Sequence, residues 1–276
     1  MFRYIKKLPA FATVGAGQMA TLLMPKGWTY RSLVLKYKRN GVAATEAEMK
    51  SDLTAIRIKV NGEAKRTFSA KEVLDIETSF LGETVEAGIL HIPLQAKWLK
   101  TIQAQDNLSW GTLNLDTLSI EVDIDAGAVT PSLEAHTEVD PVGNALGAII
   151  ESRSYHYNAA GAGTLEISDL PKSFGQLVGL HMDTAVVSAF ALTINGQEIV
   201  STDVDVLNSL YKRKPMQRVP QAGWVHFDPL VLNRLGDVIN MNAEDWRLKL
   251  TTTGAGTIGL YVQTLNAPLG LPNIKG

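Results

Sequence analysis

The sequence predicts an all-β protein built from two tandem eight-stranded jelly rolls, a double jelly roll, with one short helix in each copy. Three observations predict this fold: short segments recur in order, apolar and polar residues alternate in many places, and helical periodicity is scarce. The recurring segments are 25–28 and 171–174, Asn61-Gly62 and Asn195-Gly196, and 91–94 and 226–230. Chance matches do not keep their order and spacing three times, so the chain contains two copies of one β-rich unit.

Strict alternation of apolar and polar residues is clearest in segments 56–60, 118–125, 190–194 and 246–250. A period of two with one apolar face is typical of a strand in a sheet that is packed on one side. An Asn-Gly pair follows the first of these strands in each copy and supplies the positive φ angles of a tight hairpin. Two facing antiparallel sheets would bury the apolar faces, and a jelly roll is the topology that this strand count favours.

Each copy has one helix signal directly after its hairpin. In the first copy, Ser69 and Glu72 have the spacing of a capping box, and apolar residues follow at helical spacing. In the second copy, Thr202 and Asp205 have the same spacing and predict the matching helix.

Between the copies the composition changes to small residues interrupted by Pro131 and Pro141. This stretch predicts a long connector, which is ordinary between two domains and unusual inside one. The expected organisation is an N-terminal arm over 1–12, jelly roll 1 over 13–127, a connector over 128–158 and jelly roll 2 over 159–276.

The composition narrows the function classes. The chain has 276 residues, of which 45% are hydrophobic and 20% charged, so it can bury a core. Its net charge of −2 gives no general attraction to nucleic acid, and we expect no sequence-specific nucleic-acid binding. With no cysteine, the chain forms no disulfide and offers no thiol chemistry.

The N-terminal segment is basic and short. Arg3, Lys6 and Lys7 lie among apolar residues, without the apolar stretch of a signal peptide. Two interpretations remain: a frayed soluble terminus, or an arm that contacts a negatively charged surface such as lipid headgroups.

No catalytic, cofactor or metal site is predicted. Residues 15–20 match the dinucleotide pattern G-x-G-x-x-A, but Pro25 and Gly27 would end the required helix after about two turns. Asp123 and Asp125 lie on one side of a predicted strand and could bind a hard cation, although a solvated sheet face or a loop cap is the favoured interpretation.

The five histidines lack the spacing of a metal site. His91 and His226 occupy matching positions in the two copies, which favours a structural role in which each imidazole bonds to a loop carbonyl.

Four segments, in order along the chain, resemble the major capsid proteins of corticovirus-type tailless bacteriophages, which carry an internal lipid membrane. They are 17–37 with the turn at 25–30, 118–135 with Val122-Asp123-Ile124-Asp125, 163–171, and 245–250.

The resemblance implies a structural coat protein rather than an enzyme. It implies homotrimeric, pseudo-hexagonal capsomers that pack against neighbouring capsomers in an icosahedral shell around the membrane. The arm with Arg3, Lys6 and Lys7 would face the lipid, and minor vertex and membrane proteins would be further partners. No cofactor is expected; structural calcium is compatible with the family, with no ligands assigned. The resemblance places the chain in the virion capsid, assembled in the host cytoplasm.

The main alternative is a two-domain β-sandwich that binds carbohydrate or a receptor, since jelly rolls serve both roles. Exposed Trp28, Trp98 or Trp224 would favour sugar stacking, whereas buried tryptophans would favour the coat protein. An enzyme such as a double cupin is opposed by the missing histidine spacing.

Overall fold

The computed structural model describes residues 3–170 and 175–266. These residues form two compact units. Unit 1 comprises the described residues up to 79 together with 83–152, and unit 2 comprises 80–82 and the described residues from 153 to 266.

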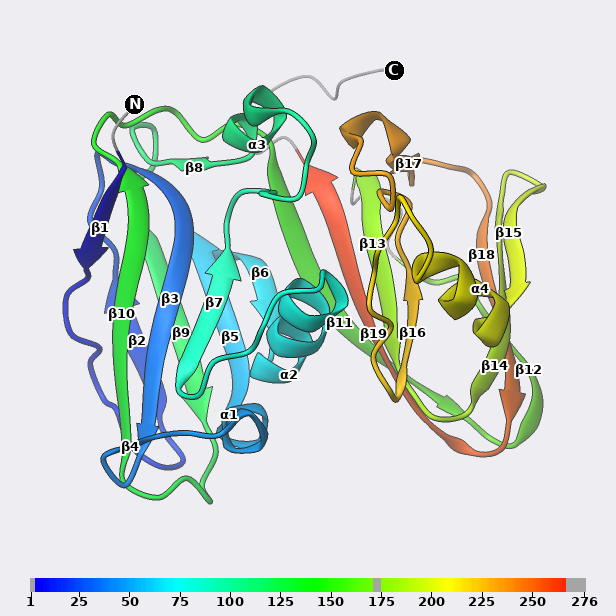
Figure 1. Cartoon of the computed structure of the whole chain (residues 1–276), viewed down its shortest axis with the longest axis horizontal. Coiled ribbons are helices and arrows are strands. Elements are labelled where there is room, and N and C mark those ends of the chain that lie inside the picture. Colours follow the sequence, from blue (N-terminus) through cyan, green and yellow to red (C-terminus); the bar gives the residue numbers. More distant parts are fainter. Residues whose placement is uncertain (1–2, 171–174, 267–276) are drawn as a thin grey trace. The chain divides into compact units, whose positions relative to one another are not determined.

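Unit 1 is a sandwich of two sheets (Figure 1). Its inward residues alternate with outward ones, most clearly along β9, where every second side chain is buried. The first sheet is β1 (Tyr4–Lys7), β10 (Pro131–Asp140), β3 (Thr29–Arg39) and β7 (Ile89–Pro93), with β4 (Val42–Ala43) and β8 (Trp110–Gly111) also on β3. The second sheet is β6 (Glu63–Phe68), β5 (Leu53–Val60), β9 (Leu118–Ile124) and β2 (Met19–Leu23). The helices are α1 (Glu46–Asp52), α2 (Ala70–Glu72), which continues as the π-helical η1 (Val73–Phe80), and α3 (Ile102–Asn107).

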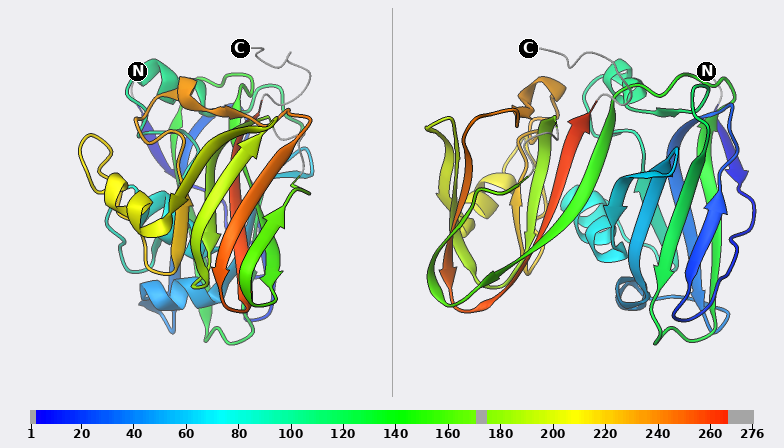
Figure 2. Two further views of the ribbon diagram at one scale, coloured as in Figure 1. Left: turned by 90° about the vertical axis from the view of Figure 1, so that its right-hand side faces the viewer. Right: turned by 180° about the vertical axis from the view of Figure 1, so that it is seen from behind.

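Unit 2 is also a two-sheet sandwich, seen from two further sides in Figure 2. Its core contains Phe190, Trp246, Leu248 and Leu260. The first sheet is β11 (Ile149–Ala159), of which residues 153–159 belong to this unit, β19 (Gly256–Asn266), β13 (Gln176–Asp183) and β16 (Trp224–Phe227). The short strand β17 (Ile239–Asn240) also pairs with β13. The second sheet is β15 (Gln197–Asp203), β14 (Val187–Ile194), β18 (Trp246–Thr253) and β12 (Ala162–Ile167). The helices are α4 (Val204–Tyr211) and the short 3₁₀ helix η2 (Leu235–Asp237).

The strand order is the same in both sandwiches. The order β1-β10-β3-β7 corresponds to β11-β19-β13-β16, and the order β2-β9-β5-β6 corresponds to β12-β18-β14-β15. In each unit a helix follows the hairpin, α2 with η1 in one and α4 in the other. The predicted double jelly roll is therefore confirmed.

The two Asn-Gly hairpins form as predicted. Asn61 and Gly62 have φ angles of 50° and 83°, and Asn195 and Gly196 have 49° and 77°. Positive φ at both central residues gives the turn the twist of the flanking strands. Of the repeated segments, 171–174 lies outside the described residues.

The helix signals are confirmed in part. Ser69 caps α2 with the reciprocal bonds of a capping box. The predicted cap at Thr202 is wrong, because Asp203 occupies the N-cap position of α4 and makes no side-chain cap bond. One helix per copy also undercounts unit 1, where α1 begins with a second capping box between Thr45 and Glu48.

The expected segment boundaries differ from the structure. The arm over 1–12 contains β1, and the connector over 128–158 contains β10 and most of β11. Pro131 is the first residue of β10, a position where proline costs no ladder hydrogen bond. The buried face of β10 includes Ala135 and Thr137, which are too small or polar to give a strong apolar signal. Only residues 141–148 link the last strand of one copy to the first of the next.

A pair of histidines lies inside unit 2. His181 on β13 and His226 on β16 are buried, and their Nδ1 atoms lie 2.9 Å apart. The Phe80 ring stacks on His226 at a centroid distance of 4.0 Å. His226 is buried in unit 2, and its partners are another imidazole and a loop amide instead of the expected loop carbonyl.

The hydrogen bonds assign one tautomer to each ring. The Gln221 amide donates to Nε2 of His226 at 3.3 Å, so the proton of His226 is on Nδ1 and is donated to Nδ1 of His181. His181 then carries its proton on Nε2, where the Gln263 side chain accepts it. Burial lowers the pKa of His181 to about 3, and burial with the neighbouring imidazole lowers that of His226 further. Both rings are therefore neutral at pH 7.

We predict that acid destabilises unit 2 through this pair. An unfolded histidine binds a proton near pH 6.5, whereas the buried rings do not, so the stability is complete above pH 6.5 and is lost as the pH falls toward 3. The free energy of unfolding should fall by about 1.4 kcal/mol per pH unit for each histidine. Urea unfolding at pH 7, 6 and 5 measures the slope.

The variant His226→Gln should show a shallower slope, and His156→Gln, at an exposed site in the same unit, should keep the slope of the parent protein. Equal slopes for both variants would contradict the assignment.

Candidate functional site

The predicted basic arm is an edge strand of unit 1. β1 runs antiparallel to β10, from the pair Tyr4–Val139 to the pair Lys7–His136. The Leu8 amide extends this ladder by donating to the Ala135 carbonyl at 2.9 Å. The backbone of the arm is therefore fixed by the sheet.

Acidic residues of β10 neutralise two of the three arm cations. The Lys7 ammonium lies 3.0 Å from Glu134, and the Arg3 guanidinium lies 3.0 Å from Glu138. Lys7 lowers the pKa of Glu134. Burial opposes ionisation of Glu138, but its bonds to Lys97 and Arg3 outweigh this and lower its pKa as well. The sequence signal for these partners is the regular spacing of Glu134 and Glu138 along β10. The prediction missed it because it assigned residues 128–158 to a connector.

Lys6 differs from its two neighbours. Strand alternation places Arg3 and Lys7 on the outward face with the glutamates, and Lys6 on the opposite face, beside Thr137. Its ammonium lies 5.2 Å from the centroid of the Tyr4 ring. No ion pair of Lys6 is found within residues 3–170 and 175–266. Lys6 is the arm cation whose charge is available to an external anion.

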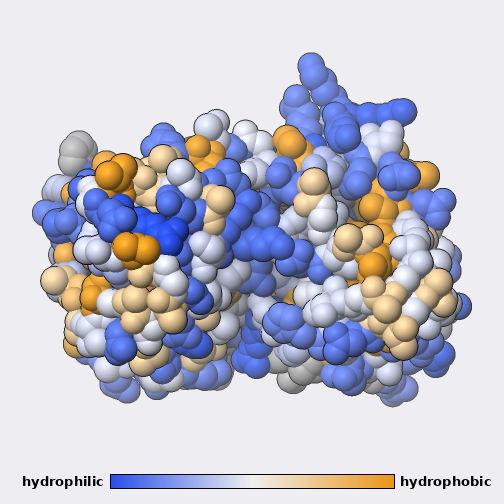
Figure 3. Space-filling view, turned by 90° about the horizontal axis from the view of Figure 1, so that it is seen from below, coloured by the Kyte–Doolittle hydropathy of each residue, from blue (hydrophilic) through white to orange (hydrophobic). Residues whose placement is uncertain are grey.

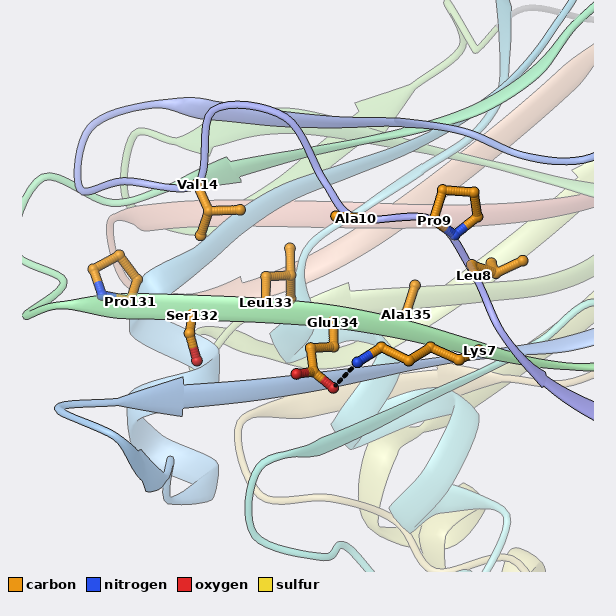
Figure 4. A pocket seen from close by; sticks show the side chains of 10 residues that line it. All are labelled: Lys7, Leu8, Pro9, Ala10, Val14, Pro131, Ser132, Leu133, Glu134 and Ala135. Carbon is orange, nitrogen blue, oxygen red and sulfur yellow. Dashed lines mark hydrogen bonds and ion pairs between the residues drawn. The ribbon is translucent and has the colours of Figure 1, made fainter.

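A groove of about 350 Å³ follows the end of β1 (Figure 4). The segment from Lys7 to Val14 forms one wall, and the start of β10 forms the other. Apolar side chains, among them Leu8, Pro9 and Leu133, make up most of the lining, and the Lys7–Glu134 ion pair lies beside them. The lining therefore combines an apolar surface with one ion pair.

A buried arginine joins three elements next to the arm. Arg31 on β3 donates to Asp140 on β10 at 2.9 Å and to Gln95 at 2.6 Å, and it also contacts Asp106 on α3. Its side chain is 7% exposed. Removing one member of such a pair leaves a buried charge without a partner, so the network fixes the sheet.

The candidate cation ligands do not converge. Both oxygens of Asp123 bind Arg57, at 3.0 and 2.8 Å, and Asp125 accepts the Gly127 amide at 2.7 Å. Within the described parts of the chain, no group of three or more acidic or histidine side chains is arranged to hold a metal ion. The segment 15–20 is a turn that continues into the first two residues of β2, and it starts no helix.

The three tryptophans whose exposure would favour sugar stacking are not fully exposed. Trp224 is buried, and Trp28 and Trp98 are partly buried. On the face seen in Figure 3, apolar residues form small groups separated by polar ones. No helix among the described residues is long and apolar enough to cross a membrane.

Comparison with known proteins gives matches to two family models. Residues 5–140 match the model of the viral coat protein P2 N-terminal domain, and residues 149–268 match that of the viral coat protein P2 C-terminal domain. The gap between the two matches coincides with the link between β10 and β11.

Individual relatives agree with the family models. The chain is 27% identical to the major capsid protein P2 of Pseudoalteromonas phage PM2 over 200 residues, which cover 70% of this chain and 71% of that protein. The crystal structure of the PM2 protein superposes with a TM-score of 0.88 at 20% identity, covering 98% of this chain and 99% of that one.

The fold is also similar to that of more distant coat proteins. The STIV MCP gives a TM-score of 0.69 at 10% identity, covering 97% of this chain and 98% of that one. A PBCV-1 capsid model gives 0.65 at 10% identity, covering 96% and 94%. The carbohydrate-binding alternative finds no support in these comparisons. The chain therefore belongs to the viral coat protein P2 family and is a major capsid protein of the PM2 type.

Proposed function

We propose that three copies of this chain form a pseudo-hexagonal capsomer, and that such capsomers tile an icosahedral shell around a lipid membrane. The observation that carries this proposal is the identical strand order of the two units. Two similar sandwiches per chain supply six similar blocks from three chains, so a threefold oligomer can occupy a sixfold packing position. The family, whose members include the PM2 major capsid protein, supports assembly of the chain with copies of itself.

The chemistry of the molecule suits a structural role. Its buried charges serve the fold: Arg31 bonds Asp140, Arg66 pairs with Glu77, and Arg218 bonds Asp228. The relatives named above are capsid proteins, which supports a structural rather than a catalytic function. Calcium between subunits remains a prediction without assigned ligands.

We also propose that β1 lies against the membrane inside the shell. Lys6 supports this role, because its charge is not neutralised by a carboxylate among the described residues and anionic headgroups attract such a cation. Minor proteins at the vertices and in the membrane would complete the particle, which would assemble in the host cytoplasm.

The purified chain is expected to be a trimer. Light scattering at micromolar concentration should give three times the 29.9 kDa mass of one chain. A monomer under these conditions would contradict the capsomer proposal.

Membrane contact is expected to depend on Lys6. The variant Lys6→Ala should bind anionic vesicles about fivefold more weakly, because one cation near such a surface contributes about 1 kcal/mol. Flotation with anionic and with neutral vesicles measures this. Lys212→Ala, which removes an exposed lysine of unit 2, is the matched control and should bind as the parent does. If the two variants bind anionic vesicles equally well, the arm has no membrane role.

A further inference from the structure

Among the edge strands of the described residues, β1 in unit 1 and β15 in unit 2 are largely exposed. β1 ends one sheet of unit 1, and all four of its residues are exposed. β15 ends one sheet of unit 2, and four of its first five residues are exposed. Exposed edges with free backbone groups pair readily with another strand, so a stable protein covers or blunts them.

The duplication shows what covers the corresponding edges. The counterpart of β1 is β11, and the counterpart of β15 is β6. Within unit 1, Ser152 at the start of β11 pairs in parallel with Arg66 of β6. Within unit 1, the start of β11 thus lies on the outer edge of β6, whereas no strand among the described residues lies on the outer edge of β15.

β6 has a β-bulge where β11 contacts it, and β15 has a β-bulge at the equivalent position. The register of β6 on β5 shifts around Lys65, and the register of β15 on β14 shifts around Ile199, its counterpart. Lys65 reaches Glu151 of β11 at 3.4 Å, and its side chain is only 14% exposed. Ile199, at the equivalent place, is 41% exposed.

β1 presents chemistry that matches β15. The outward side chain of Ile5 is 83% exposed, so it can make an apolar contact with Ile199. This contact would replace the ion pair between Lys65 of β6 and Glu151 of β11. The Leu8 amide faces β10, so alternation directs the amide and carbonyl of Ile5 toward the open edge.

We propose that β15 of one copy pairs in parallel with β1 of the next copy, with Ile199 beside Ile5. The contact joins two different surfaces, so it is heterologous and closes into a ring when the rotation between copies fits. This inference rests on the proposed trimer and identifies the strands that hold it together.

A proline substitution tests the backbone pairing. Ile5→Pro removes an amide that faces away from β10, so the fold of unit 1 should remain, as measured by circular dichroism and thermal unfolding. The concentration at which the trimer half-dissociates should rise about tenfold or more. Ile5→Ala keeps the amide and is the matched control, with a smaller rise.

Cross-linking tests the neighbours directly, because the parent chain has no cysteine. The double variant Ile5→Cys with Ile199→Cys, treated with a bismaleimide that spans about three residues of strand, should give a ladder that ends at three chains. The control, Leu23→Cys with Ile199→Cys, places the first thiol on β2, another exposed edge strand, and should stay uncross-linked.

The outcomes separate the two proposals. A trimeric parent whose Ile5→Pro variant dissociates at the same concentration as Ile5→Ala, or equal ladders from both cysteine pairs, overturns the strand pairing alone. A monomeric parent overturns the trimer and the pairing together.

Discussion

The backbone groups at the edge of a sheet must find partners, and this constraint organises the whole molecule. β10 illustrates it: it pairs with β3 over its full length and with β1 on its other side. Without β1, the amides and carbonyls of one side of β10 would be left open. The N-terminal residues are therefore part of the sandwich, and their charges are matched to the glutamates of the strand that they cover.

Several polar side chains that the fold buries likewise have partners within their own unit. The charged groups that are buried, such as Arg31 and Arg218, are bonded to carboxylates in the same unit. The two buried histidines are held neutral and in single tautomers by their hydrogen bonds. These groups maintain shape, and the surface, where apolar residues are dispersed in the view of Figure 3, is left for contacts with neighbours.

Much of the fold follows from local sequence signals. Strands such as β9 alternate strictly, and the Asn-Gly turns leave few alternatives for the backbone, so both were predictable. β10 and β11 were not, because prolines and small or polar residues weaken their alternation, and it is pairing with distant strands that forms them. The partners of the arm and the contact between His181 and His226 depend on residues far apart in sequence, which no local pattern specifies. The capping box of Thr45 and Glu48 was a readable signal that the prediction did not use.

The paired bulges have a consequence for the fidelity of assembly. Lys65 forms an ion pair with Glu151, whereas Ile199, at the same place in the other unit, has no charge with which to bind a carboxylate. A strand carrying the residues of β11 that docked by mistake on β15 would leave the Glu151 carboxylate against an aliphatic side chain, desolvated and without a counterion. One side chain at a bulge common to both copies thus separates the edge of β6, which the start of β11 covers within unit 1, from the edge of β15, which we propose to meet another molecule. After duplication, divergence at this one position gives the two copies edge strands that accept different partner strands.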